Sequence, residues 1–280
     1  MTEMARDDAA KIVRDFVAER LDGELDALQD FDISTLADDA KYGRQGQNDF
    51  DADDCLLTRA VCVLAWSDVF PGLDMLSIGS KRAYRGDTMN TFHTMFGRDM
   101  EEWPGHYRGI EKFHPDDEMR NLAGSFLHVV TTIGNYVVLP NRPNRNRETL
   151  NTYRGCHPEW HDYFDEFMAA LEKVLADAPG QDGVLRDLVR ERNGDAFGAY
   201  FGAAGFRKLA ERLFLGDYLG EDGHALILYS RETGKVMHHW MEPRPPDEEY
   251  MRGARWYVRN AVRIIRSRAE RIVNALRSKI

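Results

Sequence analysis

The sequence predicts a mainly α-helical protein with a small β-hairpin, formed as a single compact domain plus a long C-terminal amphipathic helix. Apolar residues recur at intervals of three and four over long stretches, which is typical of amphipathic helices. The best strand candidate is Tyr136–Leu139, which is short, apolar and β-branched, and Ala225–Tyr229 is a second candidate. Hydrophobic residues make up 43% of the 280 residues, which favours a globular protein over a disordered one.

The first elements are predicted from periodicity and from helix-capping residues. Residues 4–20 carry an apolar face of helical spacing, and residues 30–52 are acidic and irregular. Asp53 or Asp54 is expected to cap a helix that continues to Trp66. Gly86-Asp87-Thr88 is expected to form a turn and an N-cap before a short helix that ends at Gly97.

The middle of the chain alternates helices with turns. Pro115 and the three acidic residues after it suit the start of a helix, and residues 131–134 end it. The strand at 136–139 then leads into the polar loop 140–147. Pro158 is expected to start another helix. Further helices are predicted at about 182–193, 195–203 and 205–219.

The last segment divides into a linker and a heptad-patterned helix. Residues 242–247 (EPRPPD) are expected to be rigid, and the helix runs from about 248 to 278. Its apolar seam repeats at spacings of four and three, through Val258, Val262, Ile265, Ala269, Ile272 and Leu276. We therefore divide the chain into a helical core, 1–241, and a segment, 242–280, that packs on the core or on a partner, including a second copy.

The charge is unevenly distributed. The net charge is −10, but residues 251–280 carry +8, so the first 250 residues carry −18. An acidic whole argues against a general nucleic-acid coat. The basic helix could contact the acidic surface of its own chain, densest in 22–54, or a partner, or phosphates.

Location is inferred from three features. The N-terminus has neither the basic start nor the apolar core of a signal peptide, and no apolar run is long enough to span a bilayer. Cys55, Cys62 and Cys156 leave one thiol unpaired in any disulfide scheme. A soluble protein of the reducing cytoplasm fits best, without contact with a membrane.

Candidate site residues lie in the polar run between 85 and 165. Arginine forks and asparagine amides suit a phosphate or carboxylate ligand. The ligand-binding candidates are Asp87, Asn90, Asn135, Asn141, Arg142, Arg145, Arg147, Asn151 and Arg154, and the proton-transfer candidates are His93 and His161. The alternative is a cluster of loops in which these side chains satisfy exposed backbone.

No motif assigns a metal or a cofactor. His157, His161 and Asp165 have a spacing that could hold a divalent ion, but His157 could equally cap the helix beginning at Pro158. Phosphate-loop, dinucleotide-binding and catalytic-serine motifs are absent. Metal and cofactor therefore stay unassigned.

Three segments together resemble an uncharacterised family of bacterial proteins, a domain of unknown function. They are GDTMNTFHTMFG (86–97), TIGNYVVLPN (132–141) and LNTYRGCHPEWHDYFDEF (150–167). Outside them, GDYL (216–219) and the Arg-rich last helix also look alike. The resemblance implies a bacterial, cytoplasmic protein and no particular activity, cofactor or partner.

GNYVVLPN also resembles part of some His-Asn-His endonuclease domains, which would make the chain a metal-dependent nuclease with His128 as its base. Asn144 or Asn151 would orient that base, and His157 or His161 would bind the metal. The sequence departs from that pattern because His128 falls on an expected helix, the spacings are loose, and the closing lysine is missing.

Two classes of function therefore remain, and whether the chain is an enzyme stays open. In the first, an Asn/Arg/His cluster binds an anionic, phosphate-bearing small molecule or nucleic acid, with arginines stabilising its charge. In the second, the chain is a non-catalytic interaction or regulatory protein that works through its acidic segment and its basic helix.

Overall fold

The computed structural model describes residues 3–43, 52–70, 73, 75–76, 84–91, 117–140, 150, 153–154, 163–189, 205–228 and 248–280. Within these ranges the protein is rich in helices and carries a two-stranded antiparallel sheet. The predicted fold class is therefore confirmed.

The N-terminal part is a pair of helices joined by short 3-10 turns. Its elements are α1 (Glu3–Arg20), η1 (Leu25–Gln29), η2 (Ile33–Leu36), η3 (Ala52–Asp54) and α2 (Leu56–Trp66). Helices α1 and α2 pack against each other. The cap of α2 was predicted wrongly, because Cys55 occupies the N-cap and its thiol accepts a hydrogen bond from the backbone N–H of Thr58 at 3.4 Å.

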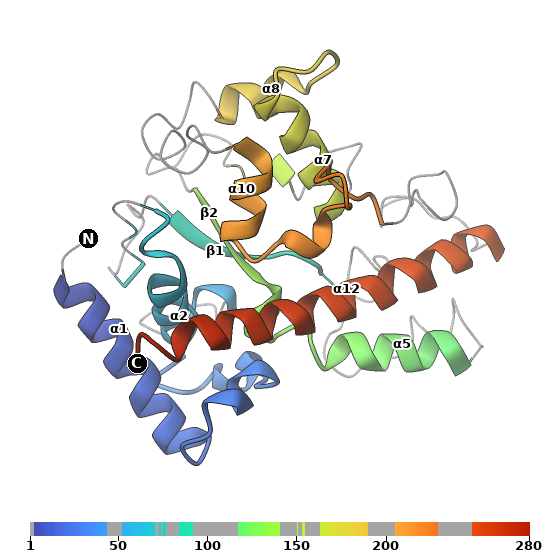
Figure 1. Cartoon of the computed structure of the whole chain (residues 1–280). Helices are drawn as coiled ribbons and strands as arrows, with labels where there is room; N and C mark the ends of the chain where they lie inside the picture. The colour runs from blue at the N-terminus through green and yellow to red at the C-terminus, as the bar shows by residue number, and fades with distance from the viewer. Residues whose placement is uncertain are drawn as a thin grey trace.

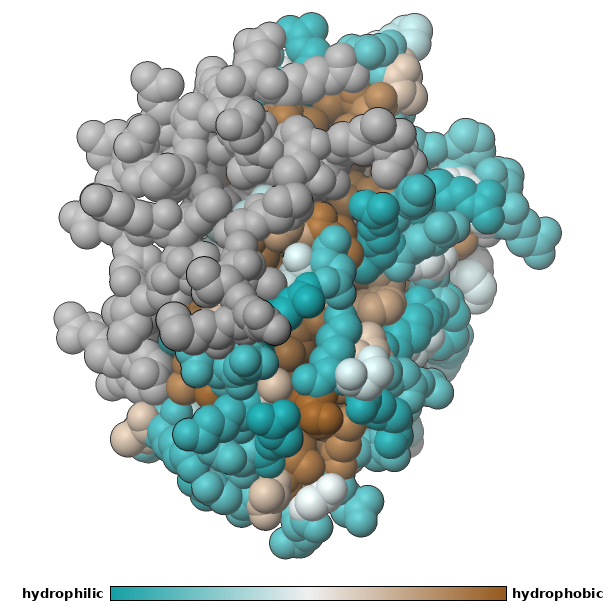
Figure 2. Space-filling model, turned by 60° about the vertical axis from the view of Figure 1, so that its left-hand side comes forward, coloured by the Kyte–Doolittle hydropathy of each residue, from teal (hydrophilic) through white to brown (hydrophobic). Residues whose placement is uncertain are grey.

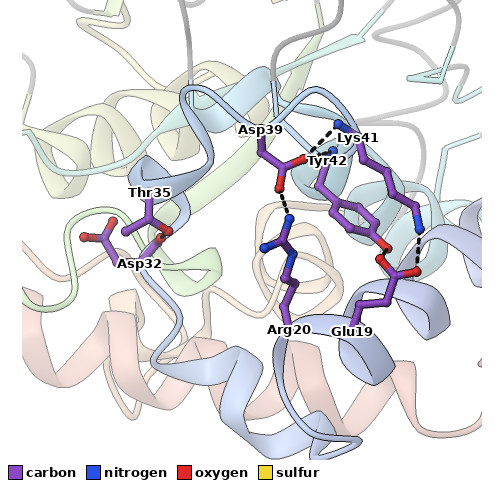
Figure 3. Close-up of polar contacts among 7 residues, drawn as sticks. All are labelled: Glu19, Arg20, Asp32, Thr35, Asp39, Lys41 and Tyr42. Atoms are coloured by element: carbon purple, nitrogen blue, oxygen red, sulfur yellow. Dashed lines mark hydrogen bonds and ion pairs between the residues drawn. The ribbon is translucent and has the colours of Figure 1, made fainter.

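The acidic segment after α1 is tied to the end of that helix. Arg20 donates to Asp39 at 2.5 Å, and Glu19 accepts from both the Lys41 ammonium at 2.6 Å and the Tyr42 hydroxyl at 2.8 Å, as Figure 3 shows. The hydrogen bond from Lys41 is the largest cause lowering the pKa of Glu19. Part of the predicted loop 30–52 is therefore an ordered turn structure with its own polar contacts.

The sheet joins two strands that are far apart in the sequence. Strand β1 (Tyr84–Thr88) pairs with β2 (Tyr136–Pro140), with Thr88 opposite Tyr136. The predicted strand at 136–139 is confirmed. The predicted turn and N-cap at Gly86-Asp87-Thr88 is wrong, because these residues belong to β1. The predicted strand at 225–229 is also wrong, since residues 225–228 contribute only an isolated bridge, Leu219 with Ala225.

The last helix of the chain is α12 (Glu248–Leu276). The other elements of this part are α5 (Asp117–Leu127), η5 (Ile133–Asn135), α7 (Phe164–Leu175), α8 (Gly183–Asp187), α10 (Gly205–Arg212) and η7 (Gly216–Tyr218). In Figure 1, α12 crosses the molecule with α5 along one side and α7, α8 and α10 on the other. Helix α7 begins later than predicted, because Tyr163 before it is extended, with ψ 119°.

Helix α12 supplies a large part of the core. It contacts η5, α5, η1 and α2, and none of its six seam residues is more than 7% exposed. Its basic side chains pair with acidic residues of the rest of the chain, including Arg259 with Glu118 at 2.6 Å and Arg277 with Asp26. The seam is thus covered within one chain, and self-association through this helix stays a prediction.

The surface is polar over most of the described area in view. Figure 2 shows hydrophilic residues over much of this face, with hydrophobic residues visible mainly in its middle. Across the ranges that the structure describes, no helix combines the length and the apolar character needed to cross a membrane.

Candidate functional site

The junction between β1 and β2 is closed by two asparagines. Asn135 directly precedes β2, and its side chain accepts from the backbone N–H of Asn90 at 3.1 Å and donates to the Asn90 carbonyl at 2.8 Å. It also donates to the carbonyl of Val130 at 2.7 Å. The backbone adds a bond from the N–H of Met89 to the Asn135 carbonyl at 2.8 Å. The amide therefore continues the sheet by one step beyond its last residue pair.

The side chain of Asn90 links the sheet to two buried tyrosines. Its amide nitrogen donates to the Tyr218 hydroxyl at 3.1 Å, and its oxygen accepts from the Tyr257 hydroxyl at 2.8 Å. Tyr218 lies in η7 and Tyr257 in α12, and all three side chains are at most 1% exposed. Burial raises the pKa of Tyr218, so its hydroxyl stays neutral and serves as a hydrogen-bonding group.

A buried ion pair lies on the other side of the same junction. Arg154 donates to Asp87 through Nη2 at 2.5 Å and through Nε at 3.2 Å. It also donates to the carbonyl of Thr88 at 2.7 Å and to that of Met89 at 3.3 Å. Only 2% of Arg154 is exposed. A planar guanidinium with several fixed donors suits this combined task better than an ammonium would.

Four of the predicted site residues are therefore brought together, although Asp87 and Arg154 are 67 residues apart. Asp87, Asn90, Asn135 and Arg154 form one buried network, which we call the junction cluster. Their polar groups bond to one another, to two tyrosines and to backbone. The other predicted residues lie outside the described ranges: His93, Asn141, Arg142, Arg145, Arg147, Asn151 and His161.

Two partners of the cluster, Tyr218 and Tyr257, and a neighbouring buried arginine, Arg268, did not stand out in the sequence. Tyr218 lies in the GDYL segment, whose resemblance offered a signal, whereas Tyr257 was marked only by its place next to Val258 of the apolar seam. Arg268 is fully buried and donates to the carbonyls of Gly134 and Tyr136, with its guanidinium 5.2 Å from the Trp66 ring. Its place three residues after Ile265 and four before Ile272 in the heptad pattern was the available signal.

Gly134 lets α12 approach the junction cluster. A Cβ atom on Gly134 would lie 2.0 Å from the carbonyl oxygen of Ile265 and 2.9 Å from the Cβ of Ala269. The backbone before β2 therefore touches the backbone of α12 directly, which only glycine allows. This contact brings Tyr257 and Arg268 of α12 within reach of the sheet.

A profile of protein families places the chain. A model described as a family of unknown function, DUF6994, matches residues 32–272. The chain belongs to the DUF6994 family. The matched range of this family contains the whole junction cluster and most of α12. Comparison with curated proteins and with solved structures gives no match.

This DUF6994 member also carries titratable groups beside the cluster, on α7. Asp165 is fully buried and accepts from the backbone N–H of Leu228 at 2.6 Å. Burial, and next to it the charge of Asp165, raise the pKa of Glu166 to about 7. Six residues after Glu166 on α7, Glu172 accepts from the backbone N–H of Ala225 at 2.9 Å and contacts the His224 ring at 2.5 Å.

Metal binding gains no support from the part of the chain that the structure describes, where no three His, Cys, Asp or Glu side chains group closely enough to hold an ion. His128, the base in the nuclease interpretation, is exposed in the turn after α5. Its proposed partners Asn144, Asn151, His157 and His161 lie outside the described ranges, so that interpretation stays a prediction.

Proposed function

We propose that this chain binds a phosphate-bearing anionic ligand, with Arg142, Arg145 and Arg147 stabilising the charge and the junction cluster positioning the segment that carries them. The observation that supports this is the convergence of Asp87, Asn90, Asn135 and Arg154 at one point. Residue 141 directly follows β2, and Leu150, at the other end of the arginine segment, is fully buried. The arginines are thus carried between two well-anchored points of the chain.

The proposal divides the predicted residues into two roles. The cluster residues already bond to protein groups, so we assign them to positioning rather than to ligand contact. Ligand contact is assigned to the arginines with Asn141 and Asn151. If the ligand reacts, His93 or His161 is the proposed group for proton transfer, because an unperturbed histidine changes charge near neutral pH.

We further propose that the protein works in the bacterial cytoplasm. Cys55 and Cys62 are buried free thiols, which suits a reducing compartment. The sequence segments that resemble bacterial proteins support the same setting. Fractionation of the source cells, with detection of the native chain, tests this location.

A thermal-shift screen tests ligand binding. The probes are inorganic phosphate, pyrophosphate and nucleoside mono-, di- and triphosphates, each with and without a divalent metal. A ligand at about one hundred times its dissociation constant should stabilise the fold by about 2.7 kcal/mol. We expect the shift to vanish in Arg142→Ala/Arg145→Ala and to persist in Arg14→Ala, a control at an exposed position of α1.

Two results would reject the proposal: no phosphate-bearing probe shifts the melting temperature, or the double variant responds like the native chain.

The alternative, a non-catalytic interaction protein, is favoured by one observation. Asp22, Glu24, Asp30 and Asp38 are exposed acids on the N-terminal part, and a basic partner protein would recognise them. A blank screen would make capture of such a partner on the native chain, compared with a variant neutralised at these four positions, the next measurement.

A further inference from the structure

The outer face of α12 carries a regular row of cations. Arg252, Trp256, Arg259, Arg263 and Arg266 follow one another at spacings of four, three, four and three, and all five are exposed. The same spacing governs the buried seam on the opposite face. The helix therefore has two working faces, of which one packs in the core and the other, which we call the arginine row, faces solvent.

Two acids among the described residues form ion pairs with the arginine row. Glu118 is shared between Arg259, at 2.6 Å, and Arg255, at 3.6 Å. Asp217 is shared in the same way between Arg263, at 3.6 Å, and Arg271. Within the described residues, each of these two carboxylates is thus shared by two guanidiniums.

Arg266 adds a further cation to the row. It has no ion-pair partner among the residues whose placement is described. The exposed acid Glu270 lies one turn beyond it. Arg266 therefore keeps an exposed positive charge that no ion pair with a described residue offsets, on a protein whose first 250 residues carry −18.

Trp256 interrupts the row with an aromatic surface. It is 37% exposed, and within the described ranges only Val184 is a comparably exposed large hydrophobic residue. An indole between guanidiniums provides a flat surface on which an unpaired base can stack, while the arginines contact phosphates. Double-stranded nucleic acid offers its phosphates but keeps its bases stacked inside, so it would use the arginines alone.

We propose that the arginine row of α12 binds single-stranded nucleic acid, with phosphates on Arg252, Arg259, Arg263 and Arg266 and one base stacked on Trp256. The helix rises by about 21 Å over the fourteen residue steps from Arg252 to Arg266. A straight line of cations suits a nucleic-acid strand, which carries one negative charge per nucleotide. The acidic remainder of the protein confines binding to this face. This inference is independent of the proposed phosphate site, which uses other residues.

Fluorescence anisotropy of a labelled twenty-residue oligothymidylate tests the proposal on the full chain. Four phosphate contacts predict that log K falls with log salt at a slope of about −2.8, and Arg266→Gln should reduce that slope to about −2.1. Trp256→Ala should weaken binding by roughly 5- to 100-fold, whereas Trp256→Phe should keep most of the affinity. The matched controls, Arg14→Gln on α1 and Val184→Ala on α8, should bind like the native chain.

Each of four results would overturn the proposal. The first is absence of binding at low salt, and the second is equal loss in Arg14→Gln and Arg266→Gln. The third is binding of duplex DNA as tight as that of the single strand, with no effect of Trp256→Ala. The fourth is equal affinity for polyglutamate, which would make the row a docking surface for acidic proteins. Thermal melts of every variant confirm that the fold is intact.

Discussion

Replacing Arg154 by alanine should destabilise the protein more than the same replacement at any exposed arginine. The side chain of Arg154 is 2% exposed and that of its partner Asp87 is 12% exposed, so neither charge is well solvated once the pair is broken. Breaking a buried pair by deleting one partner costs about 3–5 kcal/mol. Arg154→Ala also leaves the carbonyls of Thr88 and Met89 without these donors, so we expect a loss at the upper end of this range.

Urea denaturation followed by far-ultraviolet circular dichroism measures this loss. Arg186→Ala, at a side chain that is 46% exposed on α8, is the control and should change stability by less than about 0.5 kcal/mol. The double variant Asp87→Asn/Arg154→Ala should lose clearly less than the sum of its single variants, because both remove the same pair. A loss below about 1 kcal/mol for Arg154→Ala, or strict additivity, would refute the view that this pair fixes the junction.

Three further predictions concern packing and titration. Gly134→Ala should destabilise the chain by about 1–3 kcal/mol, because its Cβ would overlap a carbonyl of α12, whereas Gly124→Ala in α5, with open space around it, should be neutral or stabilising in the same urea assay. Burial raises the pKa of Glu166 from 4.5 to about 7, so the folded state holds a proton that the unfolded chain releases. The free energy of unfolding should therefore fall as pH rises from about 4.5 to 7. In Glu166→Gln this fall should be smaller by about 1–2 kcal/mol, after allowance for the partial exposure of Glu166. An unchanged pH dependence in this variant would contradict the prediction. The hydrogen bond with Glu172 raises the pKa of His224, so Glu172→Gln should lower that pKa in an NMR titration. An unchanged pKa would show that this contact does not stabilise the protonated His224.

The helices and β2 could be predicted because their signals are local. The heptad seam of α12 and the apolar face of α1 need only neighbouring residues to be recognised, and the bounds of both agree with the expectation within a few residues. The strand at 136–140 was also evident from β-branched residues between a glycine turn and a proline. Each of these patterns reflects burial of one face of a short segment, which a single window of sequence contains.

The partner of that strand could not be predicted in this way. Gly86-Asp87-Thr88 has the composition of a turn, and it forms a strand only because β2, about fifty residues later, offers its edge. The cap at Cys55 was missed for a different reason, because a cysteine thiol at the N-cap, in place of a hydroxyl, carboxylate or amide, is unusual. Four of the candidate site residues lie in one buried network, and their burial depends on tyrosines from η7 and α12, which come from distant parts of the sequence.

The chemistry of the junction cluster indicates what it contributes. Apolar residues of the same size could stabilise the site equally well, because a buried ion pair has to offset the desolvation of both charges. A polar cluster adds specificity of pairing: a slip of β1 by one residue would turn Asp87 to the opposite face of the sheet and separate it from Arg154. The amide of Asn135 sets the same register through the backbone of Asn90. The cluster thus fixes the end of β2 relative to α12, which is what the proposed binding of a ligand by the arginines after β2 would require.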